Sequence, residues 1–237
     1  MKPKQKLILF DIDGTILLLN SGIARSLFVR AIDEILHVPC TLSGNVSFAG
    51  KTDLSILFDF LQAEGIDQTI DNTQINRLWE RLTELFGNYC TSEYIRLLPG
   101  VKELIGTFQN DEHTTLGLLT GNFKSNAYLK LSAFNLHTYF PFGAFGCERI
   151  NRSELPPLAI ERANQFKAPV YFNHRNTIII GDSPLDIKCA KDNYLPVLCV
   201  ATGGFSYNQL AELTPDLIFE NLEDTDTIIN SINELLL

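Results

Sequence analysis

The chain has 237 residues, of which 45% are hydrophobic and 20% are charged, a balance typical of soluble globular proteins with one large domain or a medium domain carrying a smaller one. No apolar run reaches the roughly 18 residues that a membrane-spanning helix needs, so we expect no membrane segment. The net charge of −9 argues against non-specific binding of nucleic acid.

The N-terminal part of the chain begins with a buried strand and continues as helices. Residues 6–12 (KLILFDI) are predicted to form a parallel strand, and Asp11 and Asp13 interrupt its apolar run in a way that argues against a signal peptide. Apolar residues at helical spacing predict three helices, over residues 21–37, 52–64 and 72–90. The loop stretches LLLNSG and SEYIRLLPG are expected to bound this helical block.

The rest of the chain alternates between strands and helices. Strands are predicted at TTLGLLTGN, YFPFGAFG, NTIIIGDS, PVLCVAT and DLIFEN, and helices over residues 123–133, 155–166, 184–192 and 222–235. This alternation predicts an α/β fold, a doubly wound, Rossmann-like parallel sheet with helices on both faces. We assign residues 1–19 and 95–237 to that core, and residues 20–94 to an all-helical domain inserted after the first strand.

The cysteines give no sign of a disulfide framework. Their number, five, is odd, and no two of them have the CxxC spacing of metal or redox sites. We therefore expect them to be reduced and mostly buried, which favours a location in the cytoplasm.

Polar residues follow three of the predicted strands: Asp11 and Asp13, then Thr120, Gly121 and Asn122, then Asp182 and Asp186. Ligands of open parallel sheets bind beyond the carboxyl ends of the strands, so these residues are expected to converge on one site. Thr120 or Asp182 alone is explained equally well as a helix N-cap. Capping accounts neither for the pair of aspartates after the first strand nor for Asp186.

Carboxylates are costly to bury unless something pairs with them. Side chains alternate along a strand, so Asp11 and Asp13 are expected to point to the same side, toward Asp182 and Asp186. Such all-oxygen ligation selects a hard cation, and Mg²⁺ is the expected cofactor. Crowding should also raise the pKa of one carboxyl enough for it to hold a proton.

The motifs DIDGT, LLTGN and GDSPLD, in this order and spacing, resemble those of the haloacid dehalogenase superfamily of phosphohydrolases. The resemblance covers about residues 6–205. It implies that Asp11 is the nucleophile, and that Asp13 is the general acid and base and gives its backbone carbonyl to Mg²⁺. It further implies that Asp182 ligates Mg²⁺, with Asp186 behind it in the second layer around the metal.

The same resemblance implies how the phosphoryl group is bound. Thr120 would hydrogen-bond it, with Asn122 beside it, and the remaining motif residues expected at the substrate are Gly14, Thr15 and Gly121. The inserted helices resemble this superfamily's cap, a lid that carries substrate specificity.

The chemistry is reasonable without the resemblance. A carboxylate that attacks a phosphate ester is one anion approaching another, and a metal offsets that repulsion. Attack by Asp11 gives an aspartyl-phosphate, which splits hydrolysis into two easier steps. Dehalogenases of this superfamily lack an acid at the position of Asp13, because a halide leaves without a proton. Asp13 therefore favours phosphate chemistry.

The third superfamily motif departs from the usual pattern. It normally supplies a lysine, but the matching stretch ERINRSELPPLAIERA contains none. Arg152 is best placed by spacing to replace it, and Lys124 and Arg149 are the alternatives. Lys51, in the stretch SFAGKTD, resembles part of the cap's specificity loop and would meet a substrate anion; a solvated surface lysine is the equal alternative.

The sequence therefore predicts a Mg²⁺-dependent phosphatase of the phosphoglycolate phosphatase and β-phosphoglucomutase branch, acting on a small phosphorylated metabolite. One alternative is a phosphomutase on the same scaffold. The other is an idle binding or regulatory protein, supported by the missing lysine. Neither a nucleic acid nor a membrane is an expected partner, and the sequence leaves the substrate and the oligomeric state open.

Overall fold

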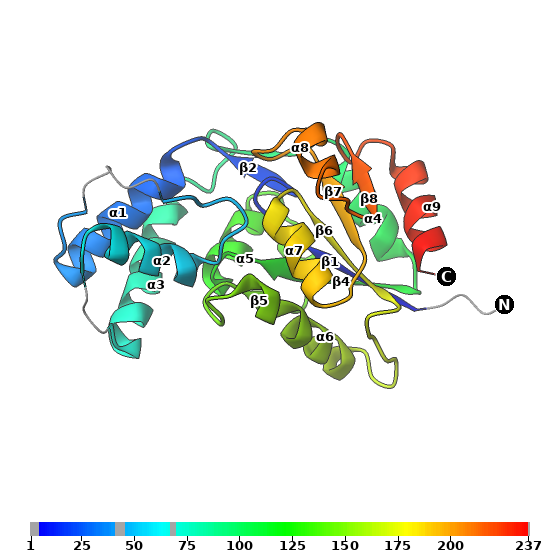
Figure 1. The fold of residues 1–237 in the computed structure, drawn as a ribbon, viewed down its shortest axis with the longest axis horizontal. Coiled ribbons are helices and arrows are strands. Elements are labelled where there is room, and N and C mark those ends of the chain that lie inside the picture. The colour runs from blue at the N-terminus through cyan, green and yellow to red at the C-terminus, as the bar shows by residue number, and fades with distance from the viewer. Residues whose placement is uncertain (1–4, 41–45, 67–69, 237) are drawn as a thin grey trace.

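A six-stranded sheet in which every strand pairing is parallel forms the centre of the computed structural model, which describes residues 5–40, 46–66 and 70–236 (Figure 1). In spatial order its strands are β5 (Gly143–Phe145), β4 (Thr114–Thr120), β1 (Lys6–Phe10), β6 (Thr177–Gly181), β7 (Val197–Val200) and β8 (Leu217–Phe219). β1 lies between β4 and β6, with Leu9 opposite Gly117 on one side and Ile179 on the other. The predicted α/β fold is confirmed.

Helices cover both faces of the sheet because β1 is apolar on both. Ile8 and Phe10 pack into one core cluster and Leu7 and Leu9 into another, and all four are fully buried. The first cluster is covered by α4 (Val101–Asn110), α5 (Lys124–Ser132) and α9 (Thr225–Leu235). The second is covered by α6 (Leu155–Phe166), α7 (Pro184–Asp192) and α8 (Tyr207–Ala211). The sequence analysis did not predict α4 or α8, although Val101, Leu104, Ile105 and Phe108 of α4 have helical spacing and are all buried.

Three further helices lie at one end of the sheet, on the left in Figure 1. They are α1 (Ile23–Leu36), α2 (Asp53–Ala63) and α3 (Asn72–Gly87), all three predicted from their periodicity. They share an apolar cluster of their own, in which the buried ring of Phe28 packs against those of Phe60 and Trp79. We refer to residues 20–94 as the cap; that they form a separate domain stays a prediction.

The sequence predicted loops for the two connections between the sheet and the cap. This prediction is wrong. The connections form β2 (Leu17–Leu19) and β3 (Ile95–Leu97), which pair antiparallel with Leu18 opposite Arg96. Each strand is only three residues long, so neither shows a recognisable alternation alone. Their pairing satisfies backbone groups that two loops would leave to solvent.

Outside the described residues lie residues 1–4 and 237 of the predicted core, and residues 41–45 and 67–69 of the predicted helical domain. The remaining short elements are the 3₁₀ turns η1 (His137–Tyr139) and η2 (Arg152–Glu154).

Among the described helices, none combines the length and the apolar character that crossing a membrane requires.

The cap packs on the sheet domain through an aromatic pair. Trp79 of α3 stacks on Phe123, the residue before α5, with ring centroids 5.0 Å apart and ring planes inclined by 20°. Both rings are almost fully buried. Such a pair adds about 0.5–1.5 kcal/mol to the free energy gained from burying the rings.

We expect Phe123→Ala to loosen this contact. Trp79 is the only tryptophan, so its emission should shift to longer wavelength and become easier to quench with iodide. Urea unfolding should show a loss of about 3 kcal/mol, in the range for truncating a buried phenylalanine. Tyr171→Ala, at a side chain that is 70% exposed, is the control and should change neither. An unchanged emission in Phe123→Ala would mean that the cap does not dock through this pair in solution.

Candidate functional site

Three carboxylates meet at the carboxyl edge of the sheet. Asp11 follows β1, Asp182 follows β6, and Asp186 lies in the first turn of α7. One oxygen of each lies within 4.8 Å of the others, and all three residues are buried. The predicted convergence of these strand ends is therefore present in the structure. Three acids buried this closely repel one another unless cations compensate their charge.

Arg152 supplies one such cation. Its Nη2 lies 3.2 Å from Asp11 Oδ1 and 2.5 Å from Asp186 Oδ1, and it also donates to the carbonyl of Leu119. Its Nη1 donates to the carbonyl of Gly50 in the cap. Arg152 lies in the η2 turn, so the residue chosen by its spacing between the motifs is in contact with Asp11 and Asp186.

The two alternative cations lie elsewhere. Lys124 is exposed, and its ammonium lies over the ring of Phe145 at 6.0 Å from the centroid. Arg149 is exposed and lies 3.5 Å from a carboxylate oxygen of Glu154. Neither residue is among those that line the cavity described below.

Burial dominates the electrostatics of the acidic cluster. It raises the pKa of Asp11 to about 6; Arg152 opposes this increase, whereas Asp186 and Asp13 add to it. Burial, together with Asp186 and Asp11, also raises the pKa of Asp182 well above its ordinary value. Burial alone would lower the pKa of Arg152, but Asp186 and Asp11 raise it, so the guanidinium stays charged. The cluster therefore favours a further cation.

Asp186 has two roles, and the sequence argument missed the first. Its carboxylate accepts hydrogen bonds from the backbone N–H of Ser183 at 3.1 Å and from the hydroxyl of Ser183 at 2.6 Å, which completes a capping box at the start of α7. Helix capping therefore does account for an acid at this position. The other oxygen faces Arg152.

Gly14 and Thr15 lie against Asp182. Gly14 has φ of +88°, and a Cβ at this position would lie 2.3 Å from Asp182 Oδ2, so only glycine fits. The hydroxyl of Thr15 donates to Asp182 Oδ1 at 3.3 Å, and the Thr202 hydroxyl donates to the carbonyl of Gly14. These contacts fix the Asp182 carboxylate, whereas the substrate contact expected of Gly14 and Thr15 stays a prediction.

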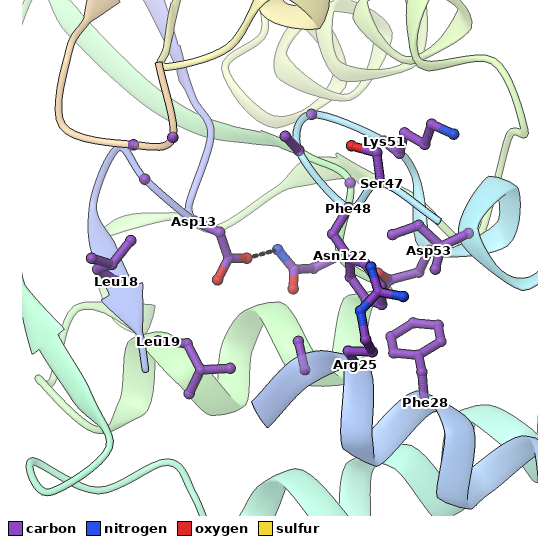
Figure 2. Close-up of a pocket in the computed structure, with 18 of the residues that line it drawn as sticks. Asp13, Leu18, Leu19, Arg25, Phe28, Ser47, Phe48, Lys51, Asp53 and Asn122 are labelled. Carbon is purple, nitrogen blue, oxygen red and sulfur yellow. Dashed lines mark hydrogen bonds between the residues drawn. The ribbon is translucent and has the colours of Figure 1, made fainter. Parts of the chain in front are cut away.

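Asp13 has different neighbours from Asp11. β1 ends at Phe10, so the alternation of a strand, which would direct both aspartates to one side, does not extend to them. The Asp13 side chain is 39% exposed, and its oxygens accept hydrogen bonds from Asn122 Nδ2 at 2.6 Å and from Lys130 Nζ at 2.7 and 2.8 Å (Figure 2 shows the Asn122 bond). Asp13 is not one of the three clustered acids.

Lys130 is the main residue that the sequence analysis missed. It projects from α5 and is 3% exposed, and its ammonium also donates to Asn122 Oδ1 at 2.7 Å. A signal was present in the sequence. Asn126 and Lys130 lie one helical turn apart, beside the apolar positions Ala127 and Leu131, so two polar residues share the buried side of the predicted helix.

Thr120 and Gly121 shape the second strand end. The Thr120 hydroxyl oxygen accepts hydrogen bonds from the backbone N–H and the side-chain amide of Asn122, at 3.2 and 2.8 Å. A Cβ on Gly121 would lie 2.0 Å from the backbone carbonyl oxygen of Lys51. The structure therefore explains this glycine by the close approach of the cap's backbone.

The loop before α2 docks on the rest of the chain through one backbone group and one side chain. The N–H of Asp53 donates to the carbonyl of Gly121 at 2.7 Å, and the hydroxyl of Thr52 donates to the carbonyl of Ile150.

The Lys51 ammonium pairs with Asp59 at 2.5 Å, and Figure 2 shows its side chain extending away from the Asp13–Asn122 pair. The predicted contact between Lys51 and a substrate anion stays a prediction.

Asp53 is a second residue that the sequence analysis missed. Its carboxylate is buried and accepts a hydrogen bond from the backbone N–H of Phe123 at 2.8 Å. Burial raises the pKa of Asp53 to about 7, against the opposing effects of Lys130 and of this N–H. An aspartate directly after the N-cap Thr52 is an ordinary helix start, so its sequence position gave no functional signal.

The site opens into a cavity of about 570 Å³ between the sheet and the cap (Figure 2). Its lining outside the cap includes the apolar Leu18 and Leu19 and a polar set: Asp11, Asp13, Asn122, Arg152 and Asp182. Its lining from the cap includes the rings of Phe28 and Phe48 and the guanidinium of Arg25. Arg25 lies over the Phe48 ring and donates to the carbonyl of Val46.

Residues 8–200 match the family model described as haloacid dehalogenase-like hydrolase. The chain belongs to this family. The resemblance inferred from the three motifs is therefore confirmed, and the enzyme class is that of a hydrolase.

Three relatives show the range of haloacid dehalogenase-like hydrolases that this chain resembles. A provisional pyrophosphatase PpaX from Caldanaerobacter subterraneus is 22% identical over 231 residues, covering 96% of each chain. A phosphoglycolate phosphatase from Shigella boydii is 23% identical over 232 residues, covering 92% of this chain and 89% of the relative. A solved β-phosphoglucomutase from Clostridium difficile has a TM-score of 0.70 at 19% identity, covering 97% and 98%.

The pH dependence of stability tests the environment of Asp53. Its pKa is about 7 in the folded chain and near its ordinary value of 3.8 in the unfolded chain, so between these values the folded chain holds more protons. The stability that Asp53 contributes is therefore complete below about pH 4 and is lost as the pH rises to about 7. Asp53→Asn keeps an acceptor for Phe123 and does not titrate.

We expect the free energy of unfolding of Asp53→Asn, relative to the parent chain, to rise between about pH 4 and pH 7 by up to about 4 kcal/mol. Urea unfolding at a series of pH values measures this. Asp33→Asn, at an exposed carboxyl on α1, is the control and should give a flat difference. A flat difference for Asp53→Asn would show that its carboxyl titrates normally.

Proposed function

We propose that this hydrolase is a Mg²⁺-dependent phosphatase that cleaves small phosphate monoesters through an aspartyl-phosphate on Asp11. The observation that carries this proposal is the arrangement around Asp11. Its carboxylate is held by Arg152 next to two further buried acids, in a cavity that Asp13 also lines. A nucleophile, a fixed cation, a cluster of metal-ligand type and a second acid are thus in one site.

The residues present fit a magnesium ion. The clustered donors are all carboxylate oxygens, which a hard cation prefers, and burial disfavours their charged forms unless a cation is near. Asp11 and Asp182 would hold the ion with the backbone carbonyl of Asp13, and Asp186, already bound to Arg152 and Ser183, would lie behind them. When bound, Mg²⁺ would offset negative charge on the phosphoryl oxygens.

The first step would transfer the phosphoryl group to the enzyme. An oxygen of Asp11 attacks phosphorus, the bond between phosphorus and the ester oxygen breaks, and that oxygen leaves with a proton from Asp13. The second step would release phosphate. Water attacks the phosphorus of the aspartyl-phosphate, its proton passes to Asp13, and the electron pair of the broken bond returns to Asp11.

The charges of the site balance for this chemistry. The three clustered carboxylates, one divalent cation and Arg152 sum to zero. Asp13 carries a proton before the first step, so its neighbour Lys130 then adds one positive charge. A phosphate dianion would therefore enter a site of net charge +1 in a chain whose net charge is −9. Without Arg152, the three clustered carboxylates and the divalent cation would sum to −1.

The cap side of the cavity indicates the kind of leaving group. The rings of Phe28 and Phe48 offer apolar surface, and Arg25 offers a cation. We propose that the alcohol part of the substrate lies there. The relatives are named for pyrophosphate, phosphoglycolate and β-glucose phosphate chemistry, so a screen of phosphorylated metabolites is needed to choose among substrates.

A phosphomutase is the alternative, since a relative of similar fold carries that name. It would return the phosphoryl group from Asp11 to a sugar instead of to water. Incubation with a sugar monophosphate followed by product analysis separates the two: a phosphatase releases inorganic phosphate, whereas a mutase yields an isomeric sugar phosphate.

Asp11→Asn should abolish turnover of p-nitrophenyl phosphate, because it keeps the shape of the side chain and removes the attacking charge. The parent chain should lose activity in EDTA and regain it with Mg²⁺, and Ca²⁺ should support it poorly because it takes more ligands at longer distances. Circular dichroism should show an intact fold in the variant. Near-normal turnover by Asp11→Asn, or full activity of the parent in chelator, would contradict the mechanism.

Arg152→Ala should lower kcat/KM by roughly 10²-fold or more, the range for losing a charged contact to the transition state. Arg152→Lys should recover much of this loss, although lysine cannot reproduce the bidentate fork. Lys124→Ala, at the exposed lysine of α5, should have a much smaller effect. A severe loss in Lys124→Ala together with a nearly silent Arg152→Ala would reverse the assignment.

A further inference from the structure

Lys130 occupies an unusual position for a lysine. Its ammonium has three N–H groups, and it donates to three oxygens: both carboxylate oxygens of Asp13 and the amide oxygen of Asn122, all at 2.7–2.8 Å. Asn122 closes the triangle by donating to Asp13 and to Thr120. Within the described residues, every hydrogen-bonding group of this ammonium therefore has a partner.

The pair is asymmetric in exposure. The side chain of Lys130 is 4% exposed, whereas that of Asp13 is 39% exposed. The ammonium thus holds the carboxylate from the protein side and leaves it open to the cavity. A buried ion pair is weak support for stability, because desolvation of an ammonium offsets much of the attraction. A role in orienting Asp13 explains the free-energy cost of burying this ammonium better than a role in stability does.

The cap completes the surroundings of Lys130. The ring of Phe86, near the end of α3, lies 5.4 Å from the ammonium, within the range of a cation–π contact. Phe86 is 2% exposed and belongs to the cap's apolar cluster. The group that holds Asp13 is therefore itself covered by the cap.

We propose that Lys130 is a positioning residue that holds the Asp13 carboxylate in place to accept a proton from water in the second step. The proposal rests on the proposed function for the identity of that step. In the structure both oxygens of Asp13 accept hydrogen bonds, from Asn122 and from Lys130, and these contacts fix the orientation of a carboxylate that lines the cavity.

The second step depends on this placement more than the first does when the leaving group is good. With p-nitrophenyl phosphate the departing phenolate needs little help from an acid, so formation of the aspartyl-phosphate requires little of Asp13. Hydrolysis of the aspartyl-phosphate still requires that one water proton pass to Asp13 while the bond from phosphorus to Asp11 breaks.

Lys130→Met tests the proposal because it removes the ammonium and keeps a side chain of similar length against Phe86. With p-nitrophenyl phosphate and Mg²⁺, we expect kcat to fall by about 10²-fold, while kcat/KM, which reports phosphoryl transfer to Asp11, changes by less than about fivefold. A burst of p-nitrophenol, close to one per enzyme, should appear as the aspartyl-phosphate accumulates.

Two further variants complete the design. Lys102→Met, at an exposed lysine of α4, is the matched control and should behave like the parent chain. Lys130→Gln keeps one amide donor for Asp13 and should show a smaller fall in kcat with the same constant kcat/KM; it also replaces Lys130→Met if that variant does not fold. Equal losses in kcat and kcat/KM, or no loss, would overturn the proposal.

A crystal structure of the Lys130 variant separates this proposal from the proposed function. If the parent chain turned over no phosphate ester, the proposed function would fail, and the orientation of Asp13 would still be measurable. We expect its carboxylate to rotate away from Asn122 or to occupy two conformers once the ammonium is removed. A carboxylate that keeps its place and its Asn122 hydrogen bond would overturn the positioning role.

Discussion

Repulsion between Asp11, Asp182 and Asp186, buried within 4.8 Å of one another, is the constraint on which the rest of the site depends. Three desolvated carboxylates are stable together only if cations compensate them, and Arg152 provides one fixed positive charge. Burial, together with the neighbouring carboxylates, raises the pKa of Asp11 and of Asp182 in spite of the opposing effect of Arg152. The repulsion that makes the cluster costly for the fold supports the proposal that it binds a divalent cation.

The cap contacts both charged side chains that hold the aspartates of the first motif. It contacts Arg152 through its backbone and Lys130 through the ring of Phe86. The carbonyl of Lys51 approaches the sheet so closely that only glycine fits at position 121, and Arg152 donates to the carbonyl of Gly50. On the other side of the cavity, Lys130 lies between Asp13 and the cap's Phe86. The two aspartates of the first motif are thus held by different cations, each of which also contacts the cap.

The sequence was sufficient for the parts of the site that depend on strand ends. Topology brings the ends of parallel strands to one edge, so Asp11 and Asp182 could be placed together, and Arg152 by its spacing between motifs. The helical spacing of Lys130 indicated that it is buried, but not which group it contacts. Its contact with Asp13, like that of Asp53 with Phe123, depends on how the helices dock on the sheet, which the sequence does not determine. The short strands β2 and β3 were missed because each is recognisable only through its partner.

The central claim is that Asp11 carries the phosphoryl group during turnover. Rapid acid quenching of the enzyme with p-nitrophenyl phosphate and Mg²⁺, followed by digestion and peptide mass spectrometry, tests it directly. The account predicts a phosphorylated peptide with the modification on Asp11, formed and lost at rates that match turnover. Sustained turnover with no phosphorylated peptide, or with the phosphoryl group on another residue, would contradict it.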